Sequence, residues 1–114
     1  MSLQNFPNGA CGDASILLGQ FFADNALGEW FYVNGERATL SGMQSHAWIE
    51  RNGLVVDITA NQFAEIDDPV LVTAEKGWHL QFVEENRHVA RIDIYDEHTR
   101  EKLRVGYELI LESV

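Results

Sequence analysis

Apolar residues recur at helical spacing over the segment from Cys11 to about Asn25. The positions that follow the i, i+3, i+4, i+7 pattern are Ala14, Leu17, Leu18, Phe21 and Phe22. Residues 4–10 contain Pro7 and the pair Asn8-Gly9, which are turn formers, so they predict a loop. The chain therefore begins its first helix at its cysteine.

After residue 28 the pattern changes to that of strands. Glu29–Val33 is aromatic and β-branched, and it predicts a strand. Asn34-Gly35 is a frequent turn pair, and the small and polar residues 36–44 predict a loop.

A β-hairpin is predicted over residues 45–58. In Ser45–Glu50, His46, Trp48 and Glu50 alternate with Ala47 and Ile49. Arg51-Asn52-Gly53 is a tight connection, and Leu54–Ile58 returns antiparallel to the first strand.

The second half of the chain mixes short strands with a helix. Residues 59–69 predict a loop or a short helical turn, and residues 70–73, 78–83 and 89–95 predict three strands. From Asp96 the apolar residues return to helical spacing, with a second hairpin as the competing interpretation.

Length and charge narrow the possible functions. A chain of 114 residues is one domain, over residues 1–114. Its formal charge of −10 repels phosphate, which argues against nucleic acid and anionic membrane as partners and weakly favours cationic ones. No apolar run reaches the ~18 residues of a membrane span, and no signal peptide is visible. Met1-Ser2-Leu3 can be an appended start, in which case native sequence begins at Gln4 and the domain is a fragment of a longer chain.

Cys11 is the only cysteine, so it forms no internal disulfide, which fits the cytoplasm. A cysteine at a helix N-terminus is activated, because the unpaired N–H groups lower its pKa. The same groups can bind the oxyanion of a tetrahedral intermediate. The alternative is a buried cysteine that only fills space.

His46 and Asp57 lie on the two strands of the predicted hairpin. With a connection at Arg51-Asn52-Gly53, His46 falls opposite Ile58, and a bulge at Gly53 would bring it opposite Asp57. Cross-strand neighbours lie about 5 Å apart, which suits a carboxylate–imidazole hydrogen bond. Taken singly, a histidine such as His46 is more often a surface or core residue, and an aspartate such as Asp57 is more often a strand-end or turn cap.

These segments resemble the transglutaminase-like superfamily, a branch of the papain-like cysteine enzymes. The resemblance rests on Cys11 opening a helix, on the His46-Ala47-Trp48 strand and on the strand that ends in Asp57-Ile58-Thr59, and it covers roughly residues 6–63. It implies a Cys11–His46–Asp57 triad. It also implies an α+β fold in which the cysteine helix packs on an antiparallel sheet.

Three further residues are candidates around the triad. Gln4 or Asn5 can supply the side chain of an oxyanion hole, as a glutamine upstream of the cysteine does in papain-like enzymes, and Gln62 can brace the site from behind the triad residues. His79, His88 and His98 show no metal-ligand spacing with one another, and a zinc site at Cys11, His46 and Asp57 is a minor alternative. We therefore predict no metal and no cofactor.

The sequence thus predicts a thiol enzyme that hydrolyses a peptide or isopeptide bond. Cys11 would attack the carbonyl, His46 would carry the proton and Asp57 would orient His46. The expected partner is a peptide or protein substrate, a cationic one being favoured by the charge. Two alternatives stay open: an inactive transglutaminase-like binding domain, and an acyltransferase or transglutaminase that uses the same thioester.

Overall fold

The structure is a computed structural model that describes residues 11–68 and 70–113, apart from the side chains of Cys11, Ile110 and Ser113. The helices and strands are α1 (Cys11–Asp24), β1 (Phe31–Thr39), β2 (Gly42–Arg51), β3 (Leu54–Asp57), β4 (Leu71–Thr73), β5 (Val83–Val89) and α2 (Glu97–Ser113). Three single-turn 3-10 helices connect them: η1 (Ala60–Gln62), η2 (His79–Gln81) and η3 (Ile92–Ile94).

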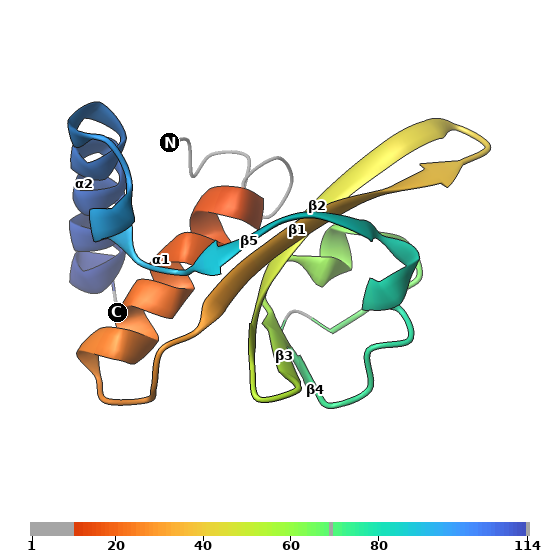
Figure 1. Ribbon diagram of the computed structural model, residues 1–114, viewed down its shortest axis with the longest axis horizontal. Coiled ribbons are helices and arrows are strands. Elements are labelled where there is room, and N and C mark those ends of the chain that lie inside the picture. The colour runs from red at the N-terminus through yellow and green to blue at the C-terminus, as the bar shows by residue number, and fades with distance from the viewer. Residues whose placement is uncertain (1–10, 69, 114) are drawn as a thin grey trace.

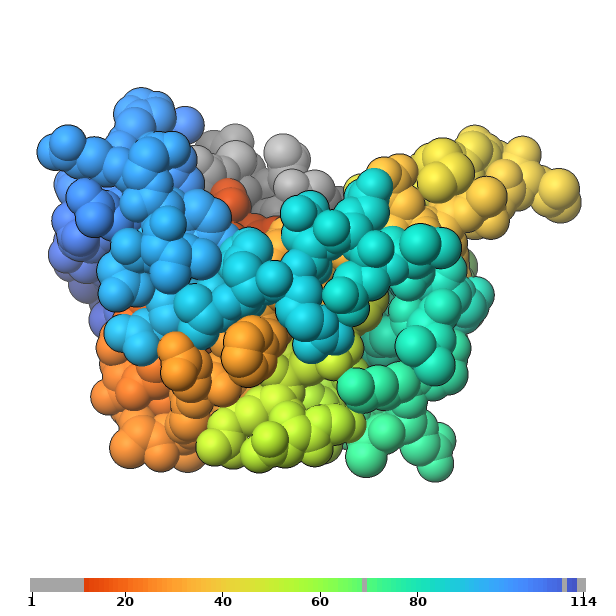
Figure 2. Space-filling model, in the orientation of Figure 1, coloured from red at the N-terminus to blue at the C-terminus, as the bar shows by residue number. Residues whose placement is uncertain are grey.

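The five strands form one antiparallel sheet in the order β4-β3-β2-β1-β5. Helix α1 lies along one face of this sheet, and α2 lies beyond α1 (Figure 1). The prediction of an α+β fold with the first helix packed on an antiparallel sheet is confirmed. The β1–β2 hairpin extends away from both helices, and its tip, which carries the fully exposed Leu40, stands clear of the body (Figure 2).

The two faces of the sheet carry separate cores. On the α1 face, Ile16 and Leu17 of the helix pack with Ala47 and Ile49 of β2. The opposite face has an aromatic cluster, whose buried members are Val33, Trp48, Val55, Phe63 and Phe82. Side chains alternate along β2, so His46, Trp48 and Glu50 lie on one face of the strand, as predicted. Ala47 and Ile49 lie on the other face.

Helix α1 is confirmed, but its buried face is shifted. Ile16 is buried, whereas Phe21, predicted to face the core, is 38% exposed. Gly19 lets the helix approach Ala90, since a Cβ at Gly19 would lie 2.3 Å from the Ala90 Cβ. The helix therefore contacts the segment after β5 as well as the sheet.

The β2–β3 hairpin is confirmed with a different turn. Arg51 pairs with Leu54, so the turn has two residues, Asn52 and Gly53. Both have positive φ, 51° and 82°, as a type I′ turn requires. The register is shifted by one residue from the expected pairing, in the direction opposite to the shift expected from a bulge at Gly53.

The predicted turn at Asn34-Gly35 and the predicted loop over 36–44 are wrong. Asn34 and Gly35 lie inside β1, where they pair with Ala47 and His46 of β2. The β1–β5 register shifts between these two residues, and a Cβ on Gly35 would lie 2.5 Å from the Val83 carbonyl oxygen. The glycine is there because a neighbouring strand approaches closely, a role that the Asn-Gly pair does not distinguish from a turn.

Two further strand predictions are wrong in the second half. Residues 78–83 contain η2, and β5 follows only at Val83. Residues 89–95 contain the end of β5 and then η3, a single helical turn. The alternating pattern of this short segment resembles that of a strand. The turn over 59–69, the short strand over 70–73 and the helix after Asp96 are confirmed, which excludes the competing hairpin.

None of the helices within residues 11–68 and 70–113 has the length and apolar character needed to cross a membrane.

Replacing Gly19 with alanine tests the contact between α1 and Ala90. The added methyl group overlaps the Ala90 Cβ and lies 2.8 Å from its carbonyl oxygen. We expect the free energy of unfolding, measured in urea, to fall by about 1–3 kcal/mol despite the better helix propensity of alanine. Gly12→Ala in the same helix is the control, because among the described residues its Cβ would meet only the Tyr32 hydroxyl, at 3.4 Å. Equal stability of the two variants would contradict this packing.

Candidate functional site

His46 lies at the place where β2 loses one of its neighbours. Strand β3 pairs with β2 only over Ile49–Arg51, so among residues 11–68 and 70–113 His46 has β1 on one side and no strand of the same sheet on the other. Its side chain is fully buried, at 0% exposure. A histidine ring is thus held inside the protein next to an open strand edge.

Asp57 is the last residue of β3, and its side chain is also fully buried. One further step of the β2–β3 register would set it beside Trp48, so it reaches His46 diagonally rather than from the opposite position. Diagonal neighbours are about 7–8 Å apart, within reach of long side chains. The His46 Nε2 and Asp57 Oδ2 atoms are 2.7 Å apart.

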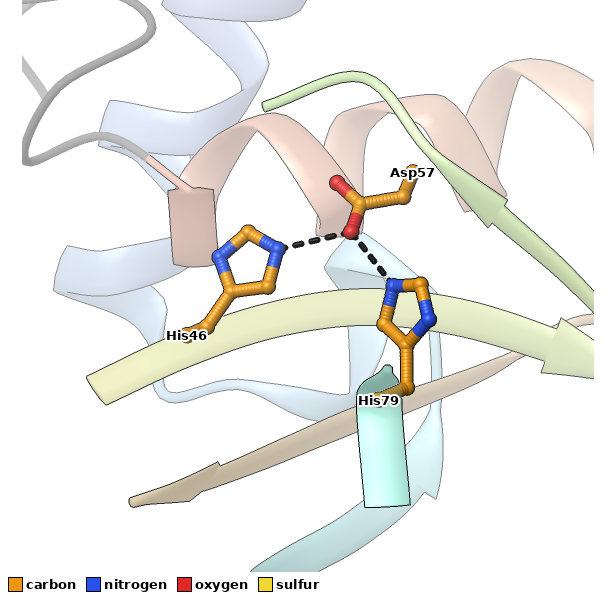
Figure 3. A group of neighbouring side chains, drawn as sticks. All are labelled: His46, Asp57 and His79. Carbon is orange, nitrogen blue, oxygen red and sulfur yellow. Dashed lines mark hydrogen bonds and ion pairs between the residues drawn. The ribbon is translucent and has the colours of Figure 1, made fainter. Parts of the chain in front are cut away.

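A second imidazole binds the same carboxylate oxygen. His79, at the start of η2, is 2% exposed, and its Nε2 lies 2.7 Å from Asp57 Oδ2 (Figure 3). The sequence predicts no role for His79. Its only sequence signal is a histidine between Trp78 and Leu80, and nothing in that pattern names a partner 22 residues away.

The other Asp57 oxygen is bound by the backbone. The Thr59 N–H donates to Oδ1 at 3.0 Å, which closes an Asx turn after β3. Burial would raise the pKa of the Asp57 carboxyl, but the hydrogen bonds from His46, His79 and Thr59 outweigh it. They hold that pKa at about 2, below its usual 3.8, so the carboxylate is ionised inside the protein.

Gln62 determines the state of the second His46 nitrogen. Its Nε2 lies 3.1 Å from His46 Nδ1, and an amide nitrogen can only donate. His46 Nδ1 therefore accepts, and the ring hydrogen lies on Nε2, where it is donated to Asp57. The hydrogen-bond network selects a neutral imidazole whose basic nitrogen points away from the carboxylate.

Aromatic rings enclose His46. The rings with centroids within 5.7 Å of its own belong to Phe63, Phe82, Trp48 and Trp78. Arg37 closes this cluster, with its guanidinium 4.9 Å from the centre of Phe82, and it is held in place by Glu65. Few water molecules can compete with hydrogen bonds inside such an enclosure, which strengthens them.

Cys11 is the first residue of α1, but its side chain lies outside the described part of the structure, as do Gln4 and Asn5. Gly12 lies against the Tyr32 hydroxyl, which accepts a hydrogen bond from Asn34, the partner of Ala47. The first turn of α1 thus lies against β1, the strand that pairs with β2 at His46.

Among the described residues, His46, Asp57 and His79 offer three ligand atoms that lie within 4.8 Å of one another and could hold a metal ion. Zinc takes four ligands, at about 2.0–2.2 Å from nitrogen or oxygen. Here both imidazole nitrogens lie at hydrogen-bond distance from one oxygen, and a cation would have to displace both hydrogens. The arrangement fits a carboxylate shared by two imidazoles better than a metal centre.

Comparison with family models, with curated proteins and with solved structures finds no match to this chain. The geometry of the site therefore has to indicate its chemistry. An oriented neutral imidazole with an ionised carboxylate behind it can take up a proton at Nδ1 and stabilise the resulting positive charge.

The Asp57 carboxylate predicts how stability depends on pH. Its pKa is about 2 in the folded protein and near 3.8 in the unfolded chain, so the unfolded chain binds the proton first as pH falls. The ionised group contributes about 2 kcal/mol above pH 5, which is lost as the pH falls toward 2. Urea unfolding at pH 6 and pH 3 should show this loss, and Asp57→Asn should abolish it. Asp68→Asn, at an exposed site, is the control and should behave as wild type; the same acid dependence in Asp57→Asn would contradict the assignment.

Proposed function

We propose that this protein is a thiol-dependent acyl-transfer enzyme of the transglutaminase-like, papain-like kind, which hydrolyses a peptide or isopeptide bond. The observation that carries the proposal is the His46–Asp57 pair. It is a buried imidazole that is anchored through Nε2 and has its other ring nitrogen turned from the carboxylate. The only cysteine of the chain is the first residue of α1.

The proposed reaction begins with the thiol. His46 Nδ1 takes the Cys11 proton, and the sulfur attacks the substrate carbonyl carbon. The oxyanion is stabilised by N–H groups at the start of α1 and by the Gln62 amide. The C–N bond then breaks, the amine leaves with the proton from His46, and a Cys11 thioester remains.

Hydrolysis completes the cycle. His46 takes a proton from water, the hydroxide attacks the thioester, and the acid leaves as the Cys11 thiolate regains its proton. Asp57 holds the imidazolium in place during both halves. The charge of −10 favours a peptide or protein substrate that carries positive charge.

Alkylation of Cys11 tests the activated thiol. Near pH 6, iodoacetamide should label the protein much faster than free cysteine, since an imidazole-paired thiol ionises at lower pH. His46→Ala should slow the reaction by about 10²-fold or more. Cys11→Ser should abolish labelling, because there is no other cysteine.

His88→Phe is the matched control, because His88 hydrogen-bonds Tyr95 and does not contact Asp57. Wild-type labelling as slow as free cysteine would reject the enzyme and favour the inactive binding domain. Rapid labelling followed by transfer of an acyl probe to added amines rather than to water would favour the transferase.

The Gln62 amide can be tested by comparing two reactions of the same thiol. Acylation by p-nitrophenyl acetate passes through an oxyanion, whereas alkylation by iodoacetamide does not. If Gln62 stabilises the oxyanion, Gln62→Ala should slow acylation by about 10²-fold and leave alkylation nearly unchanged. Equal effects on both rates would instead make Gln62 a support of His46 alone.

A further inference from the structure

His79 is the least explained part of the cluster. It lies on a different segment from the hairpin that carries His46 and Asp57, and it still donates to the same oxygen at the same 2.7 Å as His46. The two imidazole rings are 6.3 Å apart at their centroids and are inclined by only 26°. They flank the carboxylate, one on each side of Oδ2 (Figure 3).

Packing alone does not account for an imidazole at this position. The ring lies between Trp48 and Trp78, with centroids 4.7 and 4.9 Å away. Its Nδ1 atom is buried and has no hydrogen-bond partner among the described residues. A phenylalanine ring would fill the same space without burying an unpaired nitrogen. What the imidazole adds is its Nε2–H bond to Asp57.

That bond prevents the one rotation that the Asp57 carboxylate could otherwise make. Thr59 holds Oδ1, and a carboxylate held at one oxygen can still turn Oδ2 away from His46. With His46 and His79 both donating to Oδ2, rotation would break two hydrogen bonds at once in a fully buried site.

We propose that His79 is a positioning residue: its Nε2–H holds Asp57 in the orientation that keeps the His46 proton on Nε2, so that Nδ1 is the basic nitrogen. The inference rests on the proposed function for its catalytic meaning. The geometric part, control of the His46 tautomer, can be measured without any reaction.

The first measurement needs only the wild-type protein. Imidazole ¹⁵N–¹H spectra should show both His46 and His79 in the Nε2–H form, each with a strongly downfield proton bonded to Asp57. A His79 without that proton would overturn the proposal. So would ZnCl₂ binding with one-to-one stoichiometry and loss of both Nε2–H signals, because the three residues would then be a metal centre.

The second measurement compares variants. His79→Phe keeps a ring of similar size and removes the donor, so the His46 signal should become a mixture of tautomers and the Cys11 alkylation rate should fall about tenfold. His79→Gln should restore both, since a glutamine amide nitrogen can stand where Nε2 stands. His88→Phe is the control and should change neither readout.

The outcomes separate the two proposals. If His46→Ala slows alkylation but His79→Phe keeps the wild-type tautomer and rate, the role of His79 is refuted and the enzyme proposal stands. If His79→Phe loses stability without any change in the His46 tautomer, His79 is structural only. If His46→Ala has no effect on Cys11, the proposed function fails, while the tautomer data still decide the position of Asp57.

Discussion

A buried carboxylate governs this site. Asp57 is ionised with no exposed surface, and such a charge is tolerated only when each of its oxygens is hydrogen-bonded. Its partners come from β2, from the turn after β3 and from η2. The requirement to satisfy one side chain therefore fixes the relative positions of three separate segments, two of which have little regular structure of their own.

The same requirement explains why the surroundings are apolar. Rings from Phe63, Trp78 and Phe82 exclude water from His46, and Arg37 closes the cluster from outside. In water, hydrogen bonds from the two imidazoles would stabilise the carboxylate only weakly. Inside this enclosure the donors that remain would only partly offset the loss of one hydrogen bond, so the buried charge would lose stabilisation. The side chains of the site are thus held rigidly, because other arrangements would remove hydrogen bonds from the buried carboxylate.

The parts of the fold that are encoded locally could be predicted from the sequence. The α1 periodicity and the Asn52-Gly53 turn need no distant partner, and both exist. Asn34-Gly35 carries the same local signal as a turn, but pairing with β2 overrides it. The His46–Asp57 contact was anticipated from the hairpin although the register was not. The role of His79 could not be predicted from the sequence, because it depends entirely on a tertiary contact.

Strand β2 belongs to both layers of the molecule. Ala47 and Ile49 are buried against the helix, while His46 and Trp48 are buried among the rings on the other side. A slip of this strand by one residue would exchange the two sets and ruin both layers together. Over these four residues, the burial of every side chain therefore depends on one strand register. An insertion or deletion there should be as damaging as loss of the imidazole itself, whereas the protruding end of the same hairpin has no such constraint.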